Sequence, residues 1–217
     1  DEDVHGKIGS KWQNYICEIL MNLGAASEEA INLSNRELAK LPKLLQRFLE
    51  DCEFSRREES SRKACNSIVT LLQILTDYEG NCKILMNTQH LIQVLLTILK
   101  KDNWEDFLIT NNNTIDNVDD DENEQAYENS SIALETVSNT CGIFWNFTMI
   151  EGNEVKGTLI SENEELIPTF ISIAKETINA EVSKSALASI YQLSEDKVQA
   201  KILANIPKIF NDLNKIS

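Results

Sequence analysis

Residues 141–153 read CGIFWNFTMIEGN, an apolar run with helical spacing that places Trp145 next to Asn146 and ends in a Gly-Asn step. The arrangement recurs in three other stretches: ILMNLGAA at 19–26, QILTDYEGN at 73–81 and YQLSEDKV at 191–198. One slot holds a large apolar residue in every copy: Leu23, Leu75, Phe147 and Leu193. The slot before it holds Asn22, Ile74, Asn146 and Gln192. A helical segment that recurs at intervals predicts a repeat architecture.

A second set of similar stretches alternates with the first: KLPKLLQRFL at 40–49, HLIQVLLTIL at 90–99, ELIPTFISIA at 165–174 and NIPKIFNDLN at 205–214. Three of the four carry a proline at the same slot: Pro42, Pro168 and Pro207. A proline is well tolerated in the first turn of a helix, because its missing N–H has no partner there in any case. From Gly80 to Gly152 is 72 residues. Without an insertion of roughly 25–30 residues, the period is about 40–47 residues, as in helical repeats.

Helical periodicity covers nearly the whole chain, and no alternating run is long enough to predict a strand. We predict longer helices at 10–23, 36–52, 57–77, 88–101, 131–150, 163–178, 181–194 and about 205–216, and shorter ones at 27–34, 80–87, 153–161 and 195–203. The doublets Gly80-Asn81 and Gly152-Asn153 are predicted to end helices as glycine caps. Residues 111–130 are polar and acidic, which predicts a disordered loop, either an inert insertion or a partner-binding segment.

The unit of a short helix, a Pro-headed helix and a long helix resembles the armadillo repeat, and GIFWNFTMIEGN and ELIPTFISIA carry the resemblance best. The resemblance implies an all-α fold, a right-handed α-solenoid of about four three-helix repeats with incomplete terminal repeats. The two-helix HEAT unit remains an alternative. We expect a flexible tail at 1–9, first repeats at 10–110, the acidic loop at 111–130 and last repeats at 131–217, in one continuous domain. The incomplete ends favour a segment of a longer array.

The formal charge of −15 is concentrated in one region, because no Lys or Arg occurs from Asp102 to Val155, a span with thirteen Asp and Glu. Such a chain repels phosphate, so we predict no nucleic-acid partner. We predict that the acidic region binds a protein partner, and its charge favours a partner with basic segments. The alternative is that the acidic residues only make the protein more soluble. No apolar run is long enough for a membrane span. Five scattered cysteines predict reduced thiols in the cytoplasm or nucleus.

Catalytic and metal chemistry find little support in the residues. The two histidines, His5 and His90, lie in different predicted elements, and no Cys/His spacing suits zinc. The acidic run at 116–124 lacks the glycine and glutamate that a calcium loop requires at its sixth and twelfth positions. We therefore predict no enzyme activity, no cofactor and no metal.

The armadillo resemblance implies that the last helices of successive repeats line a concave groove, in which an Asn amide bonds the backbone of an extended partner segment. The candidate partner-binding residues are Asn146, Asn22, Gln192, Asn139, Glu18 and Tyr15. The alternative is that the amide caps a neighbouring backbone carbonyl. Nuclear-import adaptors of this family carry Trp four residues before the Asn, where this chain has Gly142. Trp145 is predicted to pack in the core or between repeats.

The predicted function is a non-enzymatic scaffold or adaptor that binds a partner segment along this groove. Two alternatives stay open at this point. One is a regulatory domain that binds a small GTPase through its folded surface, and the other is a structural solenoid in a cytoskeletal assembly.

Overall fold

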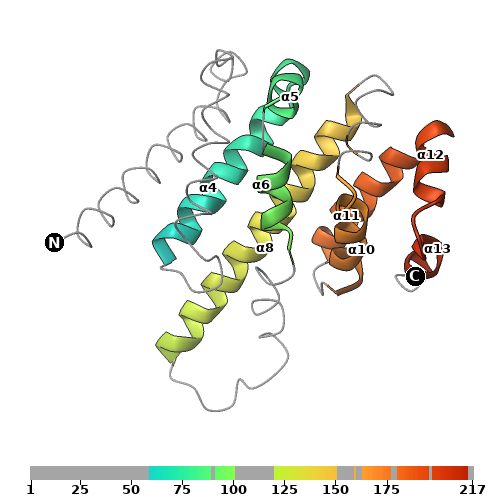
Figure 1. The fold of residues 1–217 in the computed structure, drawn as a ribbon. Coiled ribbons are helices and arrows are strands. Elements are labelled where there is room, and N and C mark those ends of the chain that lie inside the picture. The colour runs from blue at the N-terminus through green and yellow to red at the C-terminus, as the bar shows by residue number, and fades with distance from the viewer. Residues whose placement is uncertain are drawn as a thin grey trace.

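The computed structural model describes residues 59–88, 91–100, 120–150, 159, 163–176, 180–195 and 197–214. Within these ranges the regular elements are all helices and none is a strand, which confirms the predicted all-α class (Figure 1). The helices are α4 (Glu59–Thr76), α5 (Glu79–Met86), α6 (Leu91–Ile98), α8 (Asp120–Met149), α10 (Leu166–Glu176), α11 (Ala180–Ser194), α12 (Lys197–Ala204) and α13 (Ile209–Leu213). The predicted helices at 10–23, 27–34 and 36–52, and most of 153–161, lie outside the described residues.

The three longest described helices form the centre of the fold, with α8 packed between α4 and α11 (Figure 1). Three hydrogen bonds join side chains of α4, or of Asp77 just after it, to side chains of α8 that lie 69 residues later in the chain. The first joins Asn66 to Glu135 and the last joins Asp77 to Asn146. A constant separation means that α4 and α8 run in the same direction and in register. The shorter helices cover this centre: α5 and α6 contact α8, α10 and α12 contact α11, and α13 contacts α12.

The core is apolar and follows the slot pattern of the sequence. Leu75, Phe147 and Leu193, which share one predicted slot, are all buried, and this confirms the prediction for the copies that the structure describes. Phe144 lies between two other rings, with its centroid 6.1 Å from that of Phe147 and 5.4 Å from that of Phe170, both edge to face. Edge-to-face ring pairs add to the stability that burial alone provides.

Helix α8 is longer than the sequence predicted. It begins at Asp120, so residues 120–130, which were assigned to the disordered loop 111–130, belong to the helix. The prediction was wrong for these residues because polarity was taken as a sign of disorder. Glu, which occurs three times in DDENEQAYENSS, and the single Gln and Ala of that stretch are strong helix formers that can extend a helix without needing a core. Residues 111–119 lie outside the described ranges.

Two predictions about turn residues have different outcomes. Pro168 lies in the first turn of α10, as predicted, whereas Pro207 lies in the turn before α13 and is followed by Lys208 in a left-handed conformation with φ of 67°. Gly80 and Asn81 lie in the first turn of α5, which is the predicted short helix at 80–87. The predicted glycine cap at the end of the preceding helix is wrong, since α4 ends at Thr76. The short link of Asp77 and Tyr78 turns the chain without glycine, and Gly152 lies outside the described residues.

Candidate protein-interaction face

The interface between α4 and α8 carries a row of hydrogen-bonded polar side chains, here called the polar seam. At one end, Asn66 donates from Nδ2 to Glu135 Oε2 at 3.0 Å and accepts at Oδ1 from Thr136 Oγ1 at 3.0 Å. One turn further along, Asn139 Nδ2 donates to Thr70 Oγ1 at 2.8 Å. Asn139, a predicted partner-binding residue, is therefore half-buried and bonded to the neighbouring helix.

The last member of the polar seam is Asn146, the candidate residue of the opening stretch. Its Nδ2 donates to Thr76 Oγ1 at 3.0 Å and to Asp77 Oδ1 at 2.8 Å. A side-chain amide has two N–H donors and one carbonyl acceptor, so these two bonds use both donors. Oδ1 is then the atom with which Asn146 can bond a ligand, unless the bonds to α4 break.

Gly142 lies in the middle of the polar seam. A methyl group at this position would lie 3.2 Å from Gln73 Nε2 and 3.4 Å from Gln73 Cγ. The side chain of Gln73 thus lies across the backbone of α8, in the space that a larger residue would need. A tryptophan at this position, as in the import adaptors, would collide with α4, which gives a physical reason for the glycine.

Apolar side chains are exposed next to the polar seam. Trp145 is 42% exposed and Met149, one turn further along α8, is 55% exposed, while Tyr191 on α11 is 62% exposed. The prediction of core packing for Trp145 is wrong, because its indole reaches solvent while Phe144 and Phe147 fill the core. The alternative, that Trp145 packs between repeats, stays a prediction. Trp145 and Tyr191 occupy the same slot of the aligned stretches, and this shared aromatic slot is the sequence signal that could have identified them.

The remaining predicted site residues fall into two groups. Gln192 on α11 is half-buried and follows Tyr191, so it lies in the same surface region. Asn22, Glu18 and Tyr15 lie outside the described residues. Asn146, Asn139 and Gln192 are therefore the candidates that the structure places, and the first two lie together in the polar seam.

The described cysteines are buried thiols, as predicted for Cys65, Cys82 and Cys141, while Cys17 and Cys52 lie outside the described residues. Burial raises the pKa of Cys141 to about 12. The pKa of Cys82 is also raised to about 12, mainly by burial and further by the carboxylates of Asp77 and Glu79. Because thiolates are the reactive form, these thiols are poor nucleophiles at neutral pH.

The described part of the chain shows neither a candidate metal site nor a helix that could cross a membrane. No group of three or more His, Cys, Asp or Glu side chains converges on a metal-sized site within the described ranges. None of the helices in those ranges combines the length and hydropathy needed to cross a membrane.

Comparison of the chain with protein-family models, with curated protein sequences and with solved structures gives no match. The polar seam and the three exposed apolar side chains beside it are therefore the observations that support a function for this face.

Proposed function

We propose that the chain is a non-enzymatic protein-interaction scaffold built as a right-handed α-solenoid of armadillo-type repeats, in the cytoplasm or nucleus. The order of the helices supports the repeat. The short helices α5 and α6, with eight residues each, are followed by the long helix α8, and the 11-residue helix α10 is followed by the longer helix α11. The in-register packing of α4 against α8 supports it further, since successive last helices of a solenoid lie side by side.

The observation that carries the proposed binding role is the exposure of Trp145, Met149 and Tyr191 beside the polar seam. Aromatic residues and Met are enriched where proteins bind one another, and Trp and Tyr dominate the binding energy of many interfaces. We define the binding face as these three side chains together with Asn146 and Gln192. A partner segment that lies across it would cover apolar surface from both α8 and α11.

The charge of the binding face favours a partner with basic side chains. Asp77 and Glu135, both exposed, lie at the two ends of the polar seam, and Asn146 Oδ1 adds a hydrogen-bond acceptor. Asp77, which bonds Asn146, and Asn146 Oδ1 lie next to Trp145, whereas Glu135 is ten residues before Trp145 on α8, about 15 Å along the helix. An acid and an acceptor next to an exposed aromatic ring suit an extended segment that carries Lys or Arg together with apolar residues. Because both N–H donors of Asn146 are bonded to Thr76 and Asp77, its amide offers a partner one accepted hydrogen bond at Oδ1.

Peptide selection followed by calorimetry tests this proposal. Peptides selected on the wild-type chain are titrated into the wild type, Trp145→Ala, Asn146→Ala and the control Glu164→Gln, whose side chain is exposed at the start of α10. We expect Trp145→Ala to weaken binding on the order of tenfold or more, and the control to bind as the wild type. Equal affinity of all four proteins, or selection of no peptide, would contradict the proposal.

A further inference from the structure

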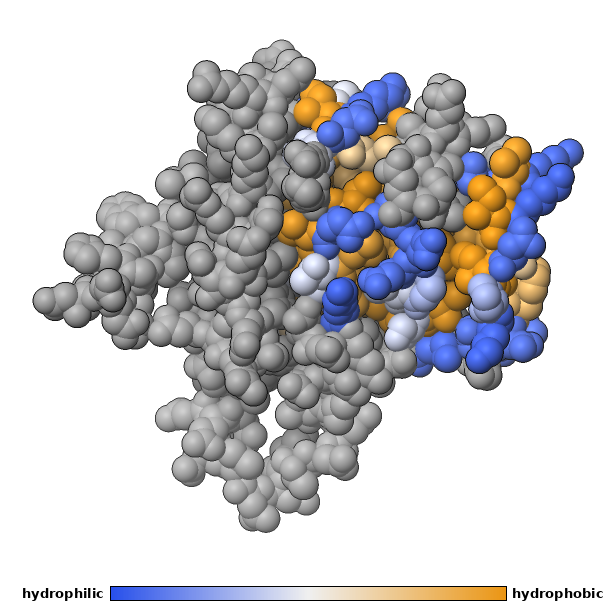
Figure 2. Space-filling model, in the orientation of Figure 1, coloured by the Kyte–Doolittle hydropathy of each residue, from blue (hydrophilic) through white to orange (hydrophobic). Residues whose placement is uncertain are grey.

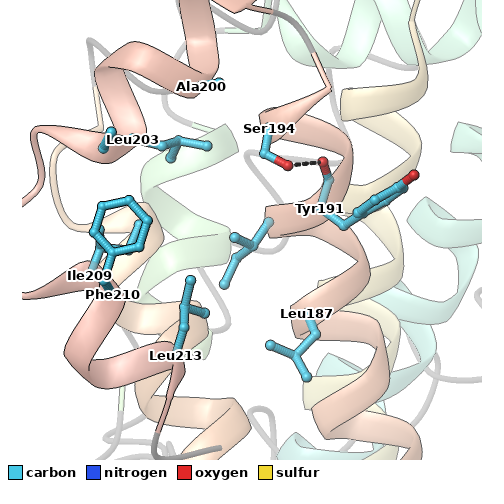
Figure 3. Close-up of a pocket in the computed structure, with 10 residues that line it drawn as sticks. Leu187, Tyr191, Ser194, Ala200, Leu203, Ile209, Phe210 and Leu213 are labelled. Carbon is cyan, nitrogen blue, oxygen red and sulfur yellow. Dashed lines mark hydrogen bonds between the residues drawn. The ribbon is translucent and has the colours of Figure 1, made fainter. Parts of the chain in front are cut away.

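A second apolar surface lies between α11, α12 and α13, and it shares Tyr191 with the binding face. It is a pocket of about 410 Å³ whose walls include Leu187 and Ile190 on α11, Leu203 on α12, and Phe210 and Leu213 on α13. Figure 3 shows Leu187 on one wall and Leu203, Phe210 and Leu213 on the other, while the ring of Tyr191 points away from them. The volume falls in the range of about 300–1,000 Å³ that is usual for ligand pockets.

The outer edge of the pocket is open to solvent, because Phe210, which lines it, is 65% exposed. Val198 and Ile202 on α12 are 59% and 36% exposed, but they lie on the opposite side of that helix from Ala200 and Ala204, which line the pocket. Figure 2 shows hydrophobic side chains reaching the surface at the side of the molecule where α11, α12 and α13 lie. Apolar side chains that are exposed next to one another mark interaction sites more often than scattered ones do.

The packing of the long helices indicates what kind of element covers this surface. One flank of α8 is covered by α4 and the other by α11. The flank of α11 away from α8 faces the pocket, and within the described residues no long helix covers it. The pocket thus continues a row of helix–helix interfaces, and a helix is the element that fits beside α11.

The charges around the pocket indicate the chemistry of that helix. Lys197, Lys201 and Lys208 are exposed near Ala200 and Ile209, which line the pocket. Two acids lie on the same side: Glu195 is exposed next to Ser194, which lines the pocket, and Asp212 lies 3.6 Å from the ammonium of Lys175. A basic rim is unusual in a chain with a net charge of −15, and it attracts acidic rather than basic segments.

We propose that this pocket binds an acidic amphipathic α-helix of a second protein. Apolar side chains spaced at i, i+4 and i+7 on that helix enter the space between Leu187, Leu203 and Phe210. Its Asp and Glu side chains face the lysines of α12 and the turn before α13. The chain then has two docking surfaces of opposite charge preference, with the extended partner on α8 and the helical partner beside α13.

Fluorescence anisotropy with designed peptides on the full chain tests this proposal. The probes are two fluorescently labelled helical peptides of about four turns with the same Leu stripe, one with Glu and one with Lys at the other positions. We expect the wild type to bind the Glu peptide on the order of tenfold more tightly than the Lys peptide, and the preference to weaken as salt rises. Equal binding of the two peptides, or binding of neither, would overturn the proposal.

Two variants and a control locate the bound peptide. Phe210→Asp places a charge on an exposed ring position, so the fold is retained, and it should weaken binding of the Glu peptide on the order of tenfold. Replacing both Lys197 and Lys201 with Glu should reverse the preference toward the Lys peptide. Met149→Asp, on the binding face of α8, should leave both affinities unchanged, which separates this surface from the proposed scaffold site. Unchanged binding to Phe210→Asp, or a wild type that dimerises in sedimentation through this pocket, would overturn it.

Discussion

The side-chain amide of Asn146 donates a 2.8 Å hydrogen bond to the carboxylate of Asp77, across the interface between α8 and α4. A second bond from the same nitrogen reaches Thr76 Oγ1 at 3.0 Å. The end of α8 is therefore fixed to the end of α4 by a group that also lies beside the exposed Trp145. A change at Asn146 acts on stability as well as on the candidate binding face, and the two effects have to be measured separately.

The contact predicts that Asn146→Asp destabilises the protein more than Asn146→Ala. Alanine removes two hydrogen bonds at a half-buried site, which costs about 1–2 kcal/mol of unfolding free energy. Aspartate in addition places a carboxylate against that of Asp77. In the double variant with Asp77→Asn, the carboxylate and the amide exchange places, so part of the lost stability should return. Urea unfolding of the wild type, Asn146→Asp, Asp77→Asn and the double variant gives the coupling energy, and a coupling near zero would contradict the contact.

The two described glycines predict opposite outcomes for the same substitution. A methyl group at Gly80 meets no atom within 4 Å, so Gly80→Ala should stabilise the protein by about 0.4–1 kcal/mol through the lower entropy of the unfolded chain. At Gly142 the same gain is offset, because Gln73 Nε2 lies 3.2 Å from the new methyl group. Thermal unfolding of both variants should give the higher midpoint for Gly80→Ala. A larger gain from Gly142→Ala would show that Gln73 does not lie over α8.

The ring cluster of the core predicts a large loss at Phe144. Its side chain is fully buried and touches Phe147 and Phe170 edge to face, so Phe144→Ala should cost about 3–5 kcal/mol of unfolding free energy. Phe210→Ala is the matched control, because the same side chain is removed from a position that is 65% exposed. Chemical denaturation should show a much smaller loss for the control. Similar losses for the two variants would place Phe210 in the core.

The sequence was sufficient to predict the helices that have an apolar stripe. The predicted helix at 57–77 is α4 (Glu59–Thr76), and the one at 181–194 is α11 (Ala180–Ser194). Periodicity succeeds there because each helix buries one face and exposes the other. It failed at residues 120–130, where α8 continues on helix propensity alone, without an apolar stripe.

The candidate site could be predicted only in part, for a reason of geometry. The repeat pattern placed Asn146 at the edge of the core, and the structure has Asn146 and Asn139 both half-buried. Their partners, Asp77 and Thr70, lie 69 residues earlier, and this register depends on how α4 stacks on α8 rather than on any local pattern. The exposure of Trp145 was missed because its position is about 100° from both neighbours on the helix, so either assignment fitted the pattern.

The buried thiols predict a loss of stability in alkaline solution. The pKa values of Cys82 and Cys141 are raised from 9.0 to about 12, for both chiefly by burial. Between these values the unfolded chain releases the thiol protons while the folded chain keeps them. The stability contributed by the neutral thiols is therefore fully present below about pH 9 and is lost as the pH rises toward 12. Each group contributes a slope of about 1.4 kcal/mol per pH unit within this window.

The variant Cys141→Ala separates the thiol contribution from that of other groups that titrate in the same window. The variant is less stable than the wild type at pH 8, because the side chain of Cys141 is fully buried and its removal leaves a cavity. Its stability should nevertheless fall less steeply between pH 9.5 and 11, by about 1.4 kcal/mol per pH unit. Urea unfolding under reducing conditions at half-unit steps of pH measures both slopes. Parallel slopes for the wild type and the variant would show that the thiol of Cys141 ionises with an ordinary pKa in the folded protein.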